Sequence, residues 1–184
     1  MTTHIMIDLE TMGTDPFSAI IDIGAVAFDP NEIGRIYGQF DCGIELASNP
    51  DIGLRMDAKT VEWWLSAKQD AARAVWLAKD KVDIRSALDG FAAWLKGFGS
   101  PKDLRIWGNG ADFDCALMQQ AYKAAGRDAP WSYGVHRCFR TIKAATHGLP
   151  WPPTQGVAHT GLGDALTQTL YLQQIVTQLG IELN

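Results

Sequence analysis

The sequence predicts an α/β domain in which helices flank a mixed β-sheet. Three β-rich apolar segments lie within residues 4–40, and helical periodicity with one further strand follows them. The short connections between the first three segments favour an antiparallel meander. The chain has 184 residues, of which 47% are hydrophobic and 20% charged, as in an ordinary globular protein with a full core. We therefore expect one domain over residues 1–184.

The expected strands are apolar or β-branched runs that end at turn residues. The second is the most apolar of them and ends at Asp29-Pro30-Asn31, so we expect it to be buried. The four segments are residues 4–8, 20–28, 36–40 and 104–107.

The expected helices begin at capping residues and show apolar side chains at helical spacing. Asp57 is suited to cap a helix that carries Val61, Trp64 and Leu65, and Asp83 is suited to cap a second one that ends before Gly97. The remaining helices are expected at residues 113–125, 141–146 (a short one) and 162–179.

Bulk properties exclude several classes of protein. The net charge of −5 argues against a protein that coats long nucleic acid through a basic surface. No signal peptide and no bilayer-spanning apolar run is present. The three cysteines, Cys42, Cys115 and Cys138, form no CxxC pair, so we expect neither a disulfide framework nor a zinc site. A reducing, cytoplasmic setting without membrane contact is the simplest interpretation.

The most informative motif is Asp8-Leu9-Glu10 at the end of the first expected strand. Side chains alternate along a strand, so Asp8 and Glu10 point to the same face. Two neighbouring carboxylates repel each other unless a positive charge lies between them. Hard divalent cations take oxygen ligands, so this pair indicates a metal site. Two surface acids on a strand that emerges into solvent are the alternative.

Two later motifs add carboxylates at helix starts. Asp114 follows the fourth expected strand, where ligand sites of open α/β sheets tend to lie. It could instead cap the helix, and Asp112 is its rival as a ligand. His159 lies in a Pro/Gly-rich loop, five positions before Asp164 in the first turn of the last helix.

Together, Asp8-Leu9-Glu10-Thr11, Asn109 to Asp114, and His159-x4-Asp164 resemble the three motifs of the DEDD superfamily of 3'-5' exonucleases, in the subclass with a histidine base. The likeness spans residues from about 4 to 175. It is closest to phage and bacterial exonucleases described as exonuclease-eight-like and to related exoribonucleases. The resemblance implies a ribonuclease H-like fold with a mixed five-stranded sheet flanked by helices, and the fifth strand is then expected near residues 135–139.

The same resemblance implies the chemistry of the site. Asp8, Glu10, Asp114 and Asp164 would hold two Mg²⁺ or Mn²⁺ ions. His159 would accept a proton from the attacking water, because histidine exchanges protons near neutral pH. The expected reaction removes nucleoside 5'-monophosphates from the 3' ends of single-stranded or frayed DNA, with RNA as an open alternative.

Substrate contacts are expected from residues beside these motifs. Met12 would wedge against the last base, and Phe113 and one of Trp63 and Trp64 would stack on a base. Adjacent helical positions diverge, so one of the two tryptophans should be more exposed. Arg137 belongs to the best basic cluster, with Arg140 and Lys143. The expected substrate-binding residues are Thr11, Met12, Gly13, Asn109, Phe113, Trp63 and Arg137.

Two other functions are alternatives to the nuclease. A phosphatase of the haloacid-dehalogenase type has a similar Asp-x-Asp-x-Thr start, but it needs an aspartate where this chain has Glu10 and gives His159 no role. A catalytically silent nucleic-acid-binding module would keep the fold without the activity. The sequence leaves open the choice between DNA and RNA, and whether the chain forms a homodimer. Asp22 is interpreted as a sheet-edge or loop-contacting acid and not as a metal ligand.

Overall fold

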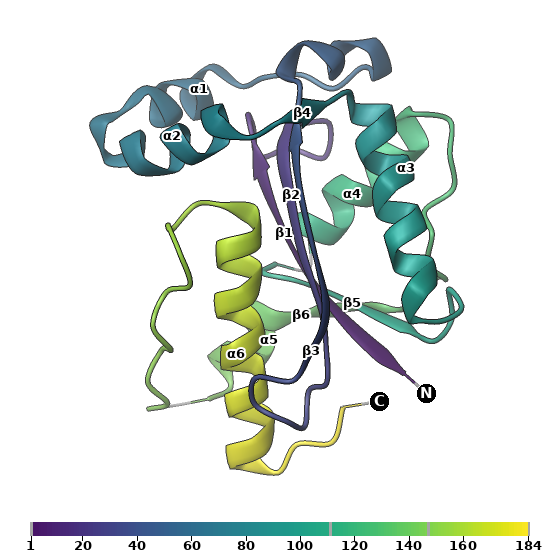
Figure 1. The fold of residues 1–184 in the computed structure, drawn as a ribbon, viewed down its shortest axis with the longest axis vertical. Helices are drawn as coiled ribbons and strands as arrows, with labels where there is room; N and C mark the ends of the chain where they lie inside the picture. The colour runs from purple at the N-terminus through teal and green to yellow at the C-terminus, as the bar shows by residue number, and fades with distance from the viewer. Residues whose placement is uncertain (1, 111, 147, 184) are drawn as a thin grey trace.

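In a computed structural model of the chain, a mixed six-stranded sheet separates two layers of helices (Figure 1). The structure describes residues 2–110, 112–146 and 148–183. The strands are β1 (Thr3–Thr11), β2 (Ile20–Phe28), β3 (Ile36–Ile44), β4 (Lys81–Val82), β5 (Leu104–Gly108) and β6 (His136–Cys138). The helices are α1 (Ala58–Leu65), α2 (Asp70–Ala78), α3 (Ile84–Leu95), α4 (Asp114–Ala124), α5 (Phe139–Ala144) and α6 (Gly161–Leu179). Short 3₁₀ turns lie at Leu46–Ser48, Pro50–Ile52, Ala67–Gln69 and Lys96–Phe98.

The strand order β4-β3-β2-β1-β5-β6 confirms the α/β class and the antiparallel meander of the first three strands. β5 and β6 then add parallel to β1. The expectation of five strands was one short, because β4 pairs with β3 through only two residues and carries no readable periodicity. β6 lies within the expected segment 135–139, and β3 continues past the expected end at residue 40.

The predicted helix starts at Asp57 and Asp83 are confirmed. The Asp57 carboxylate accepts a hydrogen bond from the backbone N–H of Thr60, and Asp83 accepts two from the amides that follow it. These bonds satisfy amides that the first helical turn leaves without a partner. Helix α2 was not predicted, because no side chain caps its start and it opens directly after a 3₁₀ turn.

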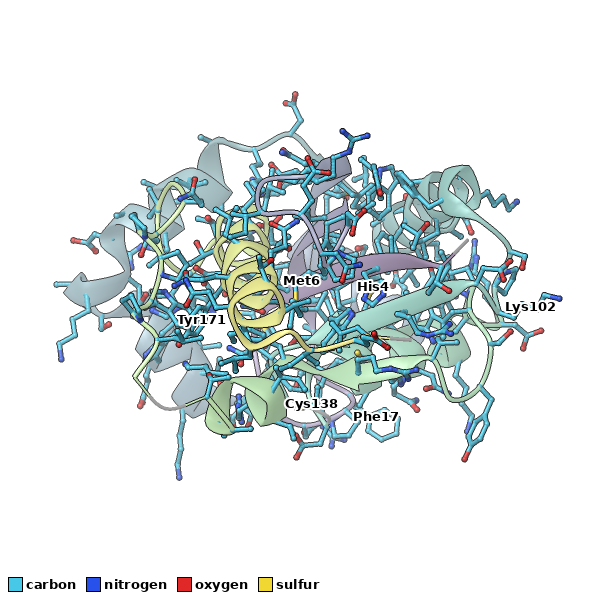
Figure 2. All side chains as sticks on the ribbon, turned by 90° about the horizontal axis from the view of Figure 1, so that it is seen from below. His4, Met6, Phe17, Lys102, Cys138 and Tyr171 are labelled. Carbon is cyan, nitrogen blue, oxygen red and sulfur yellow. The ribbon has the colours of Figure 1, made fainter. Side chains whose placement is uncertain are left out.

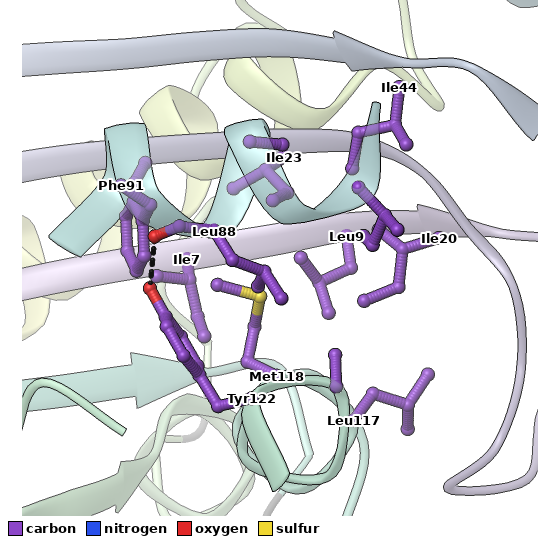
Figure 3. Close-up of a cluster of buried hydrophobic side chains, with 14 of the residues drawn as sticks. Ile7, Leu9, Ile20, Ile23, Ile44, Leu88, Phe91, Leu117, Met118 and Tyr122 are labelled. Atoms are coloured by element: carbon purple, nitrogen blue, oxygen red, sulfur yellow. Dashed lines mark hydrogen bonds between the residues drawn. The ribbon is translucent and has the colours of Figure 1, made fainter. Parts of the chain in front are cut away.

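One layer consists of α3 and α4, which pack on the sheet face formed by the odd-numbered residues of β1. Figure 3 shows Ile7 and Leu9 of β1 meeting Leu88 of α3 and Met118 of α4. The Tyr122 hydroxyl in this cluster donates a 2.7 Å hydrogen bond to the carbonyl of Leu88. A buried hydroxyl therefore has a partner, as burial in an apolar core requires.

The other layer consists of α5 and α6 and covers the face formed by the even-numbered residues of β1. Met6 packs there with Tyr171 of α6 (Figure 2). Asp8 and Glu10 continue the same face toward the end of the strand, because side chains alternate along β1. α1 and α2 lie beyond that end, near the start of α6 (Figure 1). In the described part of the chain, no helix is both long enough and apolar enough to cross a bilayer.

Candidate active site

The close approach of α6 to the sheet brings the first and third motifs together. A Cβ on Gly24 of β2 would overlap the backbone of Gly161 at the start of α6, so only glycine allows this contact. Gly24 lies opposite Asp8 in the antiparallel pair of β1 and β2. The first turn of α6, with Asp164, therefore lies directly against the carboxylate end of β1.

Asp8, Glu10 and Asp164 form the centre of the site. Each can offer a carboxylate oxygen such that these oxygens all lie within 4.8 Å of one another. Two oxygens bound to one Mg²⁺ or Ca²⁺ ion, each 2.0–2.6 Å from it, are separated by no more than about 5 Å. The donor set is hard and anionic, which is the type that such ions select. The three side chains therefore fit a divalent cation.

Burial and mutual repulsion raise the pKa values of this cluster. The pKa of Asp8 lies well above its ordinary value, first because of burial and then because of the charges of Asp114, Glu10 and Asp164. The pKa of Glu10 rises to about 8, first through burial and then through the charge of Asp164. Burial also raises the pKa of Asp164. A cation in the cluster would oppose these shifts by supplying the missing positive charge.

Asp114 lies behind this group at the start of α4, only 2% exposed. Its Oδ1 accepts a 3.1 Å hydrogen bond from the backbone N–H of Leu9, and its Oδ2 accepts one of 2.8 Å from Asn109. Burial raises the pKa of Asp114 to about 6, although these two amide hydrogen bonds oppose the rise. Asp112, its rival, is exposed to solvent. The structure thus brings Asp114, and not Asp112, next to β1.

His159 lies on the loop before α6, exposed on one side of the site. Its φ of 61° is in the left-handed region, which non-glycine residues adopt rarely and at a cost in energy. The His159 backbone N–H donates a 3.0 Å hydrogen bond to Oδ2 of Asp164. Its imidazole meets the Trp63 ring edge-on, with ring centroids 5.1 Å apart. The loop conformation therefore turns the histidine toward α1.

A cleft of about 630 Å³ opens over the carboxylates. Trp63 and Trp64 both line it. Trp63 is 41% exposed, whereas Trp64 is 3% exposed and donates a 2.9 Å hydrogen bond from Nε1 to the carbonyl of Thr11. The prediction that one of the two tryptophans is more exposed is confirmed. The other lining residues are Asp8, Leu9, Glu10, Thr11, Gly13, Thr14, Asp57, Lys59, Thr60, Asn109, Phe113, His159, Asp164 and Gln168.

Two of the expected substrate-binding residues lie outside the cleft. Met12 is 6% exposed and packs in the core with the odd-numbered face of β1, so the wedge against a terminal base is corrected. Arg137 lies on β6, two strands from β1, and its guanidinium donates hydrogen bonds to the carbonyls of Gly134 and His136. Thr11, Gly13, Asn109, Phe113 and Trp63 line the cleft, and their contact with substrate stays a prediction.

Asp22 does not lie at a sheet edge, but it contacts a loop residue, which was the other expected alternative. It lies on the central strand β2, opposite Glu10, and is 2% exposed. The ammonium of Lys79, which directly follows α2, lies 2.7 Å from its Oδ2. The same oxygen accepts a 3.2 Å hydrogen bond from the Gly161 N–H. Lys79 also pairs with Asp41, so this buried acid ties the end of α2 to the start of α6.

Sequence reasoning missed Gln168, which lies one helical turn after Asp164 on α6. Its Nε2 donates a 2.6 Å hydrogen bond to Oδ1 of Asp8. Residues four apart on a helix share a face, so the spacing from Asp164 was a usable signal. Lys59 and Thr60 in the first turn of α1 were missed as well, because the expectation for this helix rested on its two tryptophans alone.

Comparison with known proteins agrees with this geometry. A family model described as "3'-5' exoribonuclease Rv2179c-like domain" matches residues 3–176. An exodeoxyribonuclease of Enterobacteria phage T4 is 29% identical over an alignment 125 residues long, and the alignment covers 61% of this chain and 52% of the phage protein. The chain therefore spans about half the length of that relative.

Solved nuclease structures share the fold. The nuclease domain of 3'hExo, described as a DEDDh family member bound to rAMP, matches with a TM-score of 0.64 at 15% identity, over 99% of this chain and 94% of that one. E. coli Exonuclease I in complex with a dA16 oligonucleotide matches with a TM-score of 0.61 at 18% identity, over 97% of this chain and 41% of that one. Because the family model spans nearly the whole sequence, the chain belongs to the 3'-5' exoribonuclease Rv2179c-like domain family, among the DEDD-type 3'-5' exonucleases.

Proposed function

We propose that this chain is a cation-dependent 3'-5' exonuclease that releases nucleoside 5'-monophosphates from single-stranded 3' ends. The observation that carries the proposal is the convergence of oxygens from Asp8, Glu10 and Asp164 within 4.8 Å at a cleft of about 630 Å³. That volume lies in the range of pockets that enclose a small organic ligand, and a terminal nucleotide is of this size. Family membership supports the same reaction class.

RNA is proposed as the principal substrate, and DNA as the second candidate. The family description names exoribonucleases and matches residues 3–176, whereas the phage exodeoxyribonuclease matches a shorter segment. This order reverses the expectation drawn from the sequence. Discrimination requires a hydrogen bond to the 2'-hydroxyl of the terminal sugar. Thr60 and Asn109 both line the cleft and carry the polar groups that such a contact needs.

The carboxylates would bind cations and hold them in position. Asp8, Glu10 and Asp164 would share one cation, and Asp114 would contribute to a second one beside Asp8. A carboxylate oxygen accepts more than one partner, so the two amide bonds to Asp114 do not exhaust it. When bound, such cations supply Lewis-acid polarisation of the phosphate and a water of lowered pKa.

His159 moves the proton. An imidazole nitrogen accepts it from the water as the water oxygen bonds to the terminal phosphorus. The bond from phosphorus to the 3' oxygen of the preceding nucleotide breaks, and that oxygen takes a proton from solvent to leave a 3'-hydroxyl. The freed nucleotide keeps its 5'-phosphate. The exposed position of His159 allows the histidine to return its proton to solvent.

The cleft walls would grip the terminal nucleotide without reading its sequence. Trp63 and Phe113 present aromatic rings at the cleft, and stacking of a base on such a ring contributes about 1–3 kcal/mol. Thr11 and Gly13 bring the chain that follows β1 along the same wall. The edge contact between Trp63 and His159 would link base stacking to the position of the proton acceptor.

The decisive experiment is a digestion ladder on 5'-labelled single-stranded RNA and DNA of one sequence, with Mg²⁺, Mn²⁺ or chelator. We expect stepwise shortening from the 3' end, faster on RNA, and none with chelator. Asp164→Asn should abolish turnover in the folded protein, and His159→Ala should lower kcat far more than Mn²⁺ affinity. Asp112→Asn is the matched control and should be near normal, because Asp112 is exposed. Calorimetric Mn²⁺ binding without any shortening would instead identify a silent binding module.

A further inference from the structure

The segment from residue 129 to residue 163 contains no aspartate or glutamate, although the chain as a whole carries a net charge of −5. It runs from the loop before β6, through α5, to the loop that carries His159. Arg137, Arg140 and Lys143 lie within it. This segment of the chain therefore carries a net positive charge, and its last part brings His159 to the active-site cleft.

Arg140 joins this positive segment to the cleft. Its Nη2 donates a 2.6 Å hydrogen bond to the carbonyl of Asn109, which lines the cleft. The preceding residue, Phe139, is fully buried and anchors the first turn of α5 in the core. The Arg140 side chain is nevertheless exposed, so it presents a cation at the rim from a fixed piece of backbone.

Lys143 follows one helical turn later on the same face of α5. Its ammonium lies 4.2 Å from the centre of the Trp151 ring, within the range of a cation–π contact. Trp151 in turn packs against Tyr171 of α6, with ring centroids 4.7 Å apart. The aromatic contact holds a second exposed cation in place. Within the described part of the chain, neither Arg140 nor Lys143 lies within ion-pair distance of a carboxylate.

We propose that Arg140 and Lys143 form a track for the backbone of single-stranded nucleic acid, binding phosphates that precede the terminal nucleotide. This inference rests on the proposed function, which places the 3' end in the cleft. The upstream strand must then leave past the rim, and Arg140 is the cation already bonded to a rim residue. Contacts of this kind position the strand and are indifferent to its sequence.

The first test measures binding without turnover. The probe is a 5'-fluorescein RNA of about 12 nucleotides, a length that one single-strand-binding domain can contact. It is titrated in Mg²⁺ with protein carrying Asp164→Asn, and fluorescence anisotropy is measured over a range of salt concentrations. Each phosphate contact to a single strand contributes about 0.7 to the slope of log affinity against log salt concentration. Adding Arg140→Gln and Lys143→Gln should therefore lower the slope by about 1.4, with weaker affinity at low salt.

The matched control is Lys102→Gln with Lys123→Gln, which removes the same charge elsewhere. Lys123 lies on α4, in the other helical layer. Cys138 is the last residue of β6 and directly precedes α5, and Lys102 lies far from it (Figure 2). This control should keep the wild-type slope. If the salt slope falls equally in both pairs of variants, or does not fall in the Arg140 and Lys143 pair, the proposed track is wrong.

The second test separates the track from the reaction. The p-nitrophenyl ester of thymidine 5'-monophosphate fills only the cleft, whereas the oligomer also spans the rim. Arg140→Gln with Lys143→Gln should reduce kcat/KM on the oligomer by a larger factor than on the ester. Equal factors on both substrates would reject the track while leaving the nuclease intact. If the wild type hydrolyses neither the ester nor the oligomer, the proposed function fails. The salt slope of the first test still decides whether the track binds phosphates.

Discussion

The side-chain amide of Gln168 on α6 donates a 2.6 Å hydrogen bond to Oδ1 of Asp8 on β1. Gln168 follows Asp164 by one helical turn, so one helix supplies a carboxylate and also fixes the orientation of a second one. Gln168 is buried, and its Oε1 has no hydrogen-bond partner among the residues that the structure describes. A residue that orients a metal ligand acts on metal affinity even though it does not touch the metal.

Gln168→Leu should therefore weaken Mn²⁺ binding by about 10–100-fold, measured by calorimetry, because Asp8 loses its orienting donor. Gln173→Leu is the matched control on the same helix. Gln173 donates to the carbonyls of Asp29 and Arg35, far along α6 from the site. Its loss should lower Tm and leave Mn²⁺ affinity unchanged. Equal Mn²⁺ affinity in wild type and Gln168→Leu would remove the orienting role.

Glu10 should lower the stability of the cation-free protein as the pH rises from about 4.5 to about 8, and this trend is unopposed by His4 above pH 6.5. Folding raises the pKa of Glu10 from 4.5 to about 8, so the folded state binds the proton more tightly than the unfolded state in this window. Stability from this group is complete below pH 4.5 and lost as the pH passes 8. Thermal melts in chelator should show the fall, and Glu10→Gln should reduce it. A wild-type stability that stays constant between pH 6.5 and 8 would contradict the raised pKa of Glu10.

His4 should make the stability of the protein change with pH in the opposite direction, below pH 6.5. Burial, aided by the charges of Arg105 and Arg137, lowers the pKa of His4 from 6.5 to about 4. Its Nδ1 accepts a 3.0 Å hydrogen bond from Trp107 Nε1, which requires that nitrogen to be unprotonated. The folded state thus resists protonation, and stability should fall by about 3 kcal/mol as the pH drops from 6.5 to 4.

Chemical denaturation of wild type and His4→Gln in saturating Mn²⁺ would measure this effect of His4. The bound cation suppresses the contribution of Glu10, so the remaining acid slope reports on other groups. The variant keeps a hydrogen-bond acceptor for Trp107 and has no proton to gain, so its slope should be shallower. Identical slopes would show that His4 does not titrate in this range.

Substitution of the two adjacent tryptophans should affect different properties: substrate binding for Trp63 and stability for Trp64. Trp63→Ala should raise KM for an oligonucleotide by roughly 5–150-fold, the equivalent of a stacking contact of about 1–3 kcal/mol, with little change in Tm. Trp64→Phe removes the indole that bonds to the carbonyl of Thr11, so it should lower Tm. A Trp63→Ala variant with an unchanged KM would show that the base does not stack there.

The sequence alone predicted most of the framework, because the signals for it are local. Asp57 and Asp83 cap their helices through amides two or three residues away, and β2 was recognised in full from its apolar run. β4 and α2 escaped because they lack such signals: two residues show no period, and no side chain caps α2. Met12 was misplaced because its neighbours in sequence line the cleft while its own side chain enters the core.

The resemblance of the three acidic motifs to those of the DEDD superfamily predicted which residues meet, and local sequence placed these motifs at strand ends and helix starts. How they meet was decided by contacts between distant segments. The paired glycines Gly24 and Gly161 let α6 touch the sheet, and Lys79 neutralises Asp22 beneath the start of that helix. Such contacts depend on the shape and charge of residues that are 57 positions apart in one case and more than a hundred in the other, which periodicity and spacing do not encode.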